Sequence, residues 1–145
     1  MRLNLKKTDS TIYQHLGAID KELAQSGLDR WIWEMIKIRA SQINSCAYCV
    51  DKHTQDALTL GISPRKISLV SVWREAKNHF SEEEQLILRL TEEVSLIHQY
   101  GLSDEVFNGC AGAFGVELTG KIIVAAIMIN TWNRLGVSLK MEPAL

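Results

Sequence analysis

The sequence predicts an all-α fold of about six to seven helices, and three observations support this. Apolar residues recur every three or four positions along most of the chain, as they do on one face of an amphipathic helix. The 145 residues include 9 Gly and 2 Pro, so few residues interrupt the helices. No segment alternates apolar and polar residues as a half-buried strand does. The length suits one domain, and we expect residues 1–145 to form a single unit.

Capping residues and breaks mark the limits of these helices. An N-cap side chain accepts a hydrogen bond from a free backbone N–H, and glycine adopts the left-handed conformation in which many helices end. The clearest start is Ser81, three residues before Glu84 in a capping-box pattern. Ser45 is expected to cap the helix that carries two cysteines. The helices are expected to start near residues 10, 29, 46, 63, 81, 103 and 116.

The last predicted helix is the most apolar one. Residues 122–129 form an uninterrupted apolar run. Such a helix has no polar face to expose to solvent, so we expect it to be buried on most sides, by its own chain or by another subunit. The run is well short of the roughly 18 residues that indicate a membrane span, so no membrane partner is expected.

The distribution of charge limits which partners we expect, and residues 1–10 limit where in the cell we expect the protein. The formal net charge is −1, and Lys and Arg are scattered along the chain. A protein that binds nucleic acid would gather basic residues on one face, so we expect no nucleic acid partner. Residues 1–10 are polar and lack the apolar stretch of an export signal. We therefore expect a cytoplasmic protein.

Residues 34–53 contain the side chains best suited to chemistry. On a helix, Cys46 and Cys49 lie at i and i+3 and His53 lies at i+7, so all three share one face. Two thiols at this spacing can form a disulfide, and free N–H groups at a helix start favour the thiolate. In a reducing compartment such a pair is more often catalytic or metal-binding than structural. The sequence predicts a redox core at about residues 28–61.

His53 can manage the protons that thiol chemistry requires. A cysteine attacks as the thiolate, so one group must accept the thiol proton and a group must protonate the leaving oxygen. His53 follows Cys49 by one helical turn and can do both. A carboxylate at its other ring nitrogen would orient the imidazole and make it a stronger base. Glu34 is the candidate, provided that the chain folds back near Asn44.

Other interpretations of these residues stay open. Cys46, Cys49 and His53 could supply three zinc ligands, with Glu34 or another histidine as the fourth. The paired thiols could be inert and buried, which is the role we expect for Cys110. The remaining notable groups are expected to be structural, with His15, His79 and His98 near the surface, Trp31, Trp33, Trp73 and Trp132 as core or interface anchors, and Glu82, Glu83 and Glu84 as a solvated helix start.

A longer pattern around these residues resembles a known family. Glu34, residues 39–44 (R-A-S-Q-I-N), the Cys46-x-x-Cys49 pair and His53 closely resemble the alkylhydroperoxidase AhpD-like core of the carboxymuconolactone decarboxylase superfamily. The similarity continues at residues 81–84 (S-E-E-E), 102–107 (L-S-D-E-V-F) and 130–135 (N-T-W-N-R-L), so it covers most of the chain in the expected order.

The resemblance implies an all-helical subunit that assembles into trimers or hexamers. It also implies an antioxidant peroxidase or disulfide reductase, acting on a hydroperoxide or disulfide substrate. In that reaction Cys49 attacks the peroxide and Cys46 resolves the sulfenic acid as a disulfide. Glu34 and His53 relay the proton. We expect no bound cofactor or metal, but an external dithiol must reopen the disulfide, and a lipoylated or thioredoxin-like donor would do so.

One residue departs from the family pattern. Tyr48 stands where the founding peroxidases carry a second histidine, in C-x-H-C. A phenol cannot replace imidazole as a base at neutral pH, although it can donate a hydrogen bond. We therefore expect weaker peroxidase turnover, and a non-catalytic redox sensor that oxidises once is the alternative function. The lactone decarboxylase branch lacks a C-x-x-C, so that activity is not expected.

Overall fold

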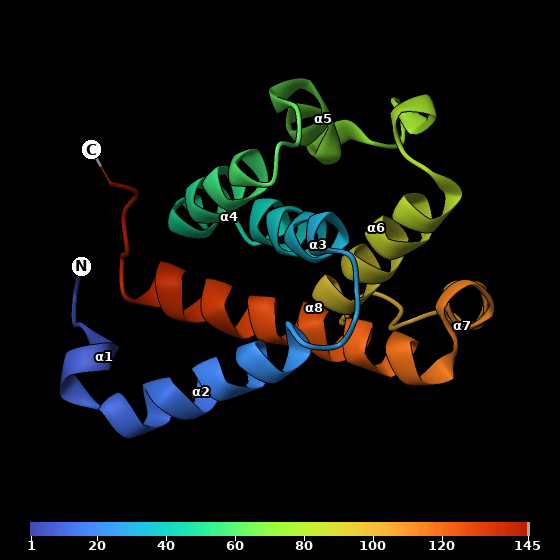
Figure 1. The fold of residues 1–145 in the computed structure, drawn as a ribbon. Helices are drawn as coiled ribbons and strands as arrows, with labels where there is room; N and C mark the ends of the chain where they lie inside the picture. The colour runs from blue at the N-terminus through green and yellow to red at the C-terminus, as the bar shows by residue number, and fades with distance from the viewer. Residues whose placement is uncertain (145) are drawn as a thin grey trace.

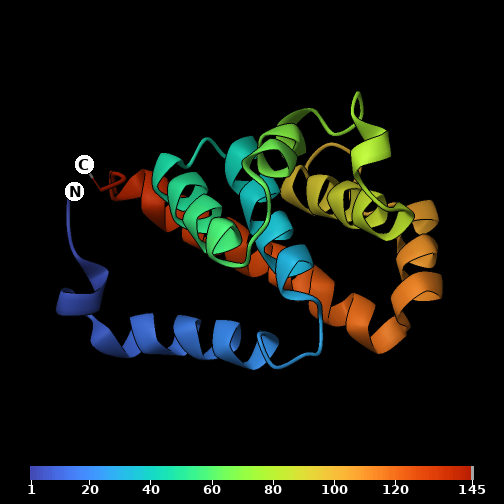
Figure 2. The same cartoon turned by 45° about the horizontal axis from the view of Figure 1, so that its top comes forward.

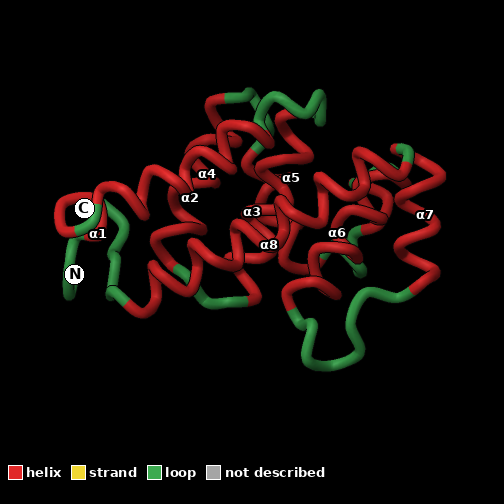
Figure 3. Tube along the Cα trace, turned by 90° about the horizontal axis from the view of Figure 1, so that it is seen from below, coloured by secondary structure: helices red, strands yellow, loops and turns green. Residues whose placement is uncertain are grey.

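Helix α3 lies at the centre of the protein and packs against α4, α6 and α8 (Figure 1). The computed structural model describes residues 1–144, and every regular element within them is helical, as the tube in Figure 3 also shows. The elements are α1 (Leu5–Thr8), α2 (Ser10–Leu23), α3 (Arg30–Ile43), α4 (Ala47–Thr59), α5 (Pro64–Leu69), the 3-10 helices η1 (Val70–Val72) and η2 (Lys77–His79), α6 (Glu82–Ser95), α7 (Asp104–Phe114) and α8 (Val116–Ser138).

The all-helical prediction is confirmed, and each expected start lies within one residue of an observed one. The capping box is present, because Ser81 Oγ accepts the Glu84 N–H at 3.1 Å while Glu84 Oε2 accepts the Ser81 N–H at 2.8 Å. Helix α1 was not expected. Its four residues are too few to show a helical period, and its cap Asn4 is the only local signal.

The turn between α3 and α4 positions the cysteines, and the expected cap there is wrong. Ser45 does not cap α4, since it adopts a left-handed φ of 54°, and Cys46 is the N-cap residue instead. The backbone N–H groups of Ser45 and Cys46 donate to the carbonyl oxygens of Gln42 and Ser41. This pair of bonds is the Schellman ending of a helix, which moves the next cap one residue onward. The chain therefore reverses within three residues, and α4 runs back along α3.

The core forms where α3, α6 and α8 meet. Its largest fully buried apolar side chains include Met35, Ile36 and Ile38 from α3, Ile87, Leu88 and Leu90 from α6, and Ile122 from α8. The other side of α8 is less covered than expected, because Val124 and Ile127 are 40% and 48% exposed. The chain's own packing thus leaves an apolar strip on α8. In residues 1–144, no helix is both long enough and apolar enough to cross a bilayer.

The N-terminal segment lies along one edge of the protein. Helix α2 runs beside α8 and stands apart from the other helices in Figure 2. It fully buries one residue, Leu23, while Ile12 and Ile19 stay exposed. The backbone N–H of Arg2 donates to the Leu139 carbonyl at 2.7 Å, so the start of the chain lies against the end of α8 (Figure 1). The fold therefore consists of a packed body and an edge helix.

The acidic run in the first turn of α6 is not wholly solvated, which corrects one expectation. Glu84 is buried, and it accepts hydrogen bonds from Trp31 Nε1 at 2.5 Å and from Lys66 Nζ at 2.6 Å. Glu82 and Glu83 are exposed as expected. The helical period explains the difference, because the third residue of the run faces the body while the first two face water. The three histidines expected near the surface, His15, His79 and His98, are exposed.

Candidate redox site

Cys46 and Cys49 are joined by a disulfide at the start of α4. Their Cα atoms are 5.4 Å apart, and the residues are 2% and 4% exposed. Cys46 caps the helix and Cys49 lies in its first turn, where backbone N–H groups lack helical partners. These partial positive charges favour a thiolate when the disulfide is open.

His53 and Glu34 meet across the hairpin of α3 and α4. Nδ1 of His53 and Oε2 of Glu34 are 2.8 Å apart, and both residues are buried. His53 also follows Cys49 by one turn on the same face of α4. The reversal that the sequence required near Asn44 is present, so the structure brings Glu34 to the imidazole although 19 residues separate the two.

The charges around Glu34 keep it ionised. Burial opposes ionisation, but the hydrogen bond with His53 and the ammonium group of Lys37, 3.1 Å from Oε1, together hold the pKa of Glu34 below its ordinary value. A carboxylate can only accept hydrogen bonds, so the shared proton resides on Nδ1 of His53. In the neutral ring Nε2 is then the nitrogen that can accept a proton.

A second carboxylate lies beside the imidazole. Asp56 Oδ2 is 3.5 Å from Nδ1 of His53, and donor atoms of Glu34, His53 and Asp56 lie within 4.8 Å of one another. Asp56 also accepts a 2.9 Å hydrogen bond from Lys52, which raises the pKa of that lysine. This set contains neither cysteine, so it differs from the zinc ligands considered from the sequence. Hydrogen bonds and ion pairs with Lys37 and Lys52 account for its arrangement.

Helix α8 passes directly behind the disulfide at Gly136. A Cβ atom added to Gly136 would lie 2.9 Å from Sγ of Cys46 and 3.5 Å from Sγ of Cys49. The first separation is shorter than carbon and sulfur tolerate, so a side chain here would have to displace a sulfur or the helix. The missing side chain is what lets α8 pack against both cysteines.

A buried polar network ties the hairpin turn to α8. Asn44 Nδ2 donates to the side-chain oxygens of Asn130 at 2.8 Å and Asn133 at 3.1 Å. Asn133, which is fully buried, donates to Ser41 Oγ at 2.8 Å. Fully satisfied buried amides fix one arrangement of the elements they join. Asn130 and Asn133 therefore help to position the turn that carries Cys46.

A mostly apolar pocket of about 650 Å³ opens beside Cys49, and it is named the Cys49 pocket below. Its lining residues are Tyr48, Cys49, Lys52 and His53 from α4, Trp132 and Leu135 from α8, Leu139, Met141 and Glu142 after α8, and Met1, Leu3, Asn4, Leu5, Lys6, Tyr13, Gly17 and Asp20 from the N-terminal segment. Cys46 is not part of this lining. A molecule in the pocket therefore meets the Cys49 sulfur first.

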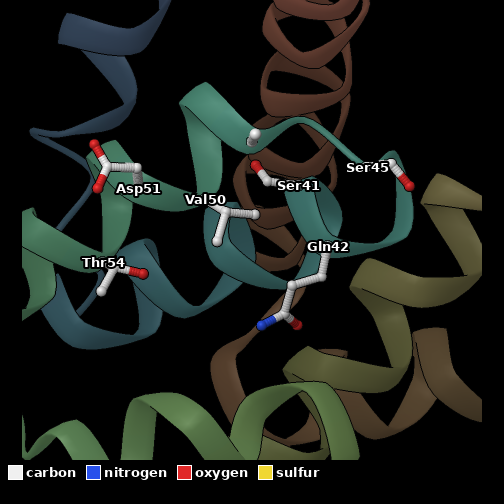
Figure 4. A pocket seen from close by; sticks show the side chains of 7 residues that line it. Ser41, Gln42, Ser45, Val50, Asp51 and Thr54 are labelled. Atoms are coloured by element: carbon white, nitrogen blue, oxygen red, sulfur yellow. The ribbon is translucent and has the colours of Figure 1, made fainter. Parts of the chain in front are cut away.

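A second, open hollow lies on a different face of α4 (Figure 4). It is lined by Ser41, Gln42, Ser45, Ala47, Val50, Asp51 and Thr54. The α4 members of this set are one position out of phase with Cys49 and His53, so they point to another side of the helix. Neither cysteine lines the hollow. Of these two cavities, the Cys49 pocket is thus the one with a cysteine in its lining.

Cys110 takes no part in this arrangement. It is fully buried in α7 within the hydrophobic core, as expected. Burial raises the pKa of its thiol to about 11, so it stays protonated at neutral pH. A protonated, buried thiol is a poor nucleophile.

Comparison with known proteins identifies the family. Residues 11–93, more than half of the chain, match the model of the carboxymuconolactone decarboxylase family. The chain belongs to this family. It is 33% identical over 121 residues to the uncharacterized protein YdfG of Bacillus subtilis (strain 168), a match that covers 83% of this chain and 82% of YdfG.

A solved structure has the same fold as this member of the carboxymuconolactone decarboxylase family. The crystal structure of ATU0492 from Agrobacterium tumefaciens matches with a TM-score of 0.94 and 35% sequence identity, over 99% of this chain and 98% of that chain. ATU0492 is a protein of unknown function, described as a candidate antioxidant defence protein AhpD. The AhpD-like relationship inferred from the sequence is therefore confirmed.

Sequence reasoning missed residues that reach the site from distant segments. Gly136 is one, and its sole signal was a glycine close to the end of the last predicted helix. Asp20 is another, since it lines the Cys49 pocket and accepts a 2.5 Å hydrogen bond from Trp132 Nε1. Asp20 and Trp132 are 112 positions apart, and nothing in the sequence pairs them.

Proposed function

We propose that this protein is an antioxidant thiol oxidoreductase that reduces hydroperoxides, or disulfides, through Cys49 and Cys46. The observation that supports this most is that Cys49 lines a pocket together with His53, whose ring is held by the ionised Glu34. A nucleophile, a base one turn away and a group that orients the base form the pattern expected of an activated nucleophile.

The first half-reaction oxidises Cys49. Nε2 of His53 takes the thiol proton, and the Cys49 thiolate attacks the terminal oxygen of the hydroperoxide. The O–O bond breaks, the departing alkoxide takes the proton back from His53 to become an alcohol, and Cys49 becomes a sulfenic acid. Glu34 stabilises the imidazolium that forms in between.

The second half-reaction closes the disulfide. The Cys46 sulfur attacks the sulfenic sulfur of Cys49, the S–O bond breaks, and the hydroxide leaves with a proton as water. An external dithiol then supplies two electrons and two protons, which returns both cysteines to thiols. A lipoylated or thioredoxin-like donor has the required chemistry, and the protein needs no bound cofactor for these steps.

We also propose that the subunit works as a homo-oligomer, a trimer or hexamer. The apolar strip on α8 supports this, because Val124 and Ile127 are left partly exposed by the chain's own packing. A partner subunit of the same kind would remove this apolar surface from water. Light scattering coupled to size-exclusion chromatography measures the subunit count directly.

The function is tested with reduced protein and cumene hydroperoxide. We expect the intact mass to fall by two hydrogens as Cys46 and Cys49 join, and we expect continued peroxide consumption when dihydrolipoamide is present. Cys49→Ser should abolish oxidation, whereas Cys46→Ser should trap a sulfenic acid or a mixed disulfide. Cys110→Ala is the matched control and should behave like the wild type. If neither a hydroperoxide nor a disulfide substrate joins Cys46 to Cys49, the proposal is rejected.

Two alternatives give different results in the same assays. A redox sensor would oxidise once and then stop consuming peroxide, even with dihydrolipoamide present. Tyr48 in place of the family histidine is the residue that favours this alternative. A structural zinc protein would carry about one zinc per chain, which elemental analysis detects.

A further inference from the structure

The N-terminal segment forms one wall of the Cys49 pocket. Leu3, Leu5, Tyr13 and Gly17 line the pocket from this segment, while α4 and α8 provide the other walls. The route to the Cys49 sulfur therefore depends on where α1 and α2 lie. If this segment moved away, the pocket would become an open surface.

Helix α2 is held to the body by few contacts. It fully buries one side chain, Leu23. Within residues 1–144, one hydrogen bond joins it to another helix, from Trp132 Nε1 to Asp20 Oδ2 at 2.5 Å. The ring of Tyr13 packs edge-on against the same tryptophan, with 5.4 Å between ring centroids. Both of these interactions, which attach α2 beside the pocket, thus involve Trp132.

Among the interactions that stabilise the Asp20 carboxylate, the hydrogen bond from Trp132 has the largest effect. Burial raises the pKa of Asp20, and the hydrogen bond from Trp132 and the nearby ammonium group of Lys37 oppose that rise. Asp20 also lines a smaller cavity together with His53 and Trp132. A half-buried carboxylate that lost its donor would need water instead, so breaking the bond favours the opening of α2.

We propose that α2 is a roof over the Cys49 pocket, latched by Asp20 and Trp132, and that this pair limits the size of the molecules that reach Cys49. Asp20 is a positioning residue in this scheme, because it acts by holding the helix. Trp132 has the same role and also lines the pocket. The consequence for oxidant selection rests on the proposed function, whereas the consequence for access to the sulfur does not.

Access is measured by labelling the reduced protein with two maleimides of different size. N-ethylmaleimide and fluorescein maleimide react by the same chemistry, so the ratio of their rates at Cys49 reports size discrimination. Mass spectrometry with fragment ions separates Cys49 from Cys46. Trp132→Phe keeps an aromatic ring but removes the N–H donor, and Asp20→Ala removes the acceptor. Asp20→Asn keeps an oxygen acceptor and is the matched control.

We expect the rate of the bulky reagent relative to the small one to rise about fivefold in Trp132→Phe and Asp20→Ala, as befits the loss of one hydrogen bond. Asp20→Asn should stay near the wild-type ratio. Amide hydrogen exchange in residues 10–23 should quicken in the first two variants alone. An unchanged ratio in both, or an equal rise in Asp20→Asn, would overturn the proposal.

Two controls keep the outcomes distinct. Labelling of the buried Cys110 would reveal global unfolding, since a latch that opens locally leaves it protected. Maleimide labelling needs no peroxide, so the roof is tested even if the protein reduces none. If the enzyme is active, the rate of Trp132→Phe with the bulky cumene hydroperoxide should also rise relative to its rate with hydrogen peroxide. A gain in labelling without peroxide reduction supports the roof and rejects hydroperoxide reduction as the function.

Discussion

His53 and Glu34 share a 2.8 Å hydrogen bond across the hairpin of α3 and α4, and this bond determines which ring nitrogen is free. Because the ionised carboxylate holds the proton on Nδ1, Nε2 is the atom available for proton transfer. The bond also joins two helices behind the cysteines. Removing this hydrogen bond should therefore change both the rate of cysteine oxidation and the stability of the fold. The two effects can be measured in separate experiments.

Glu34→Gln should slow the oxidation of Cys49 by peroxide roughly tenfold, because the amide keeps the size of the side chain but removes the charge that favours the imidazolium. Stopped-flow thiol loss measures the rate. Glu117→Gln is the control, since Glu117 is an exposed partner of Lys121 on α8. Equal rates in wild type and Glu34→Gln would remove Glu34 from the proton relay.

Stability should depend on the ionisation of Glu34 in acid. The pKa of Glu34 is lower in the folded protein than its ordinary value of 4.5, so the carboxylate stabilises the fold above that value. The contribution is lost as the pH falls through the lowered pKa. The difference in unfolding free energy between wild type and Glu34→Gln should thus be largest at neutral pH and shrink below pH 4.5. Denaturant titrations from neutral to acidic pH check this, and a pH-independent difference would contradict it.

Gly136→Ala should make the disulfide easier to reduce. The added methyl group would lie 2.9 Å from Sγ of Cys46, and a bonded sulfur has less freedom to move away than a free thiol. Overpacking of this kind costs about 1–3 kcal/mol, and 1.4 kcal/mol corresponds to about 30 mV in a two-electron couple. Redox titration against a dithiol buffer should show a rise of tens of millivolts by that scale.

Gly120→Ala is the matched control for this substitution. It lies on the same helix, and a Cβ atom there meets nothing within 4 Å. It should leave the reduction potential unchanged while raising stability slightly through helix propensity. A similar shift in both variants would show that the close approach of Gly136 to the sulfurs is unimportant.

Ser45→Gly should stabilise the protein by about 0.5–1 kcal/mol, because glycine adopts a positive φ without the steric cost that a side chain incurs. Ser45 has a φ of 54° and an exposed side chain that makes no capping bond to α4. Ser45→Ala should give no such gain, since alanine keeps the Cβ atom. Thermal unfolding of the three proteins compares them, and a gain in both variants would point away from the backbone.

The thiols should differ sharply in reactivity. Burial raises the pKa of Cys110 to about 11, so at pH 8 its thiolate fraction is small and its sulfur inaccessible. Iodoacetamide should label Cys49 in the reduced native protein, whereas Cys110 should be labelled after denaturant is added. Mass spectrometry should place the slow site at Cys110. Rapid native labelling there would mean that α7 opens readily.

The sequence predicted local structure well because its signals are local. The start of α6 was predicted from Ser81 and Glu84, which form the capping box within one turn. The turn at Ser45 was misplaced by one residue, since a serine in the left-handed conformation gives no signal that distinguishes it from a cap. The burial of Glu84 was also missed, because its partners Trp31 and Lys66 lie on other helices.

The site divides in the same way. Cys46, Cys49 and His53 were chosen as candidates because they occupy one face of a single helix, and Glu34 because one reversal of the chain suffices to bring it near. Residues that act from farther along the chain could not be assigned. Gly136 is ninety positions from Cys46, and its importance appears once α8 is packed behind the sulfurs.

The contact between the start of the chain and the end of α8 has a practical consequence. The backbone of Arg2 is hydrogen-bonded to Leu139, and Met1 and Glu142 line the Cys49 pocket. A purification tag fused next to either of these two residues would begin beside the Cys49 pocket. Kinetic work should therefore use tag-free protein, and an immobilised sample is best attached through the distant α6–α7 connection.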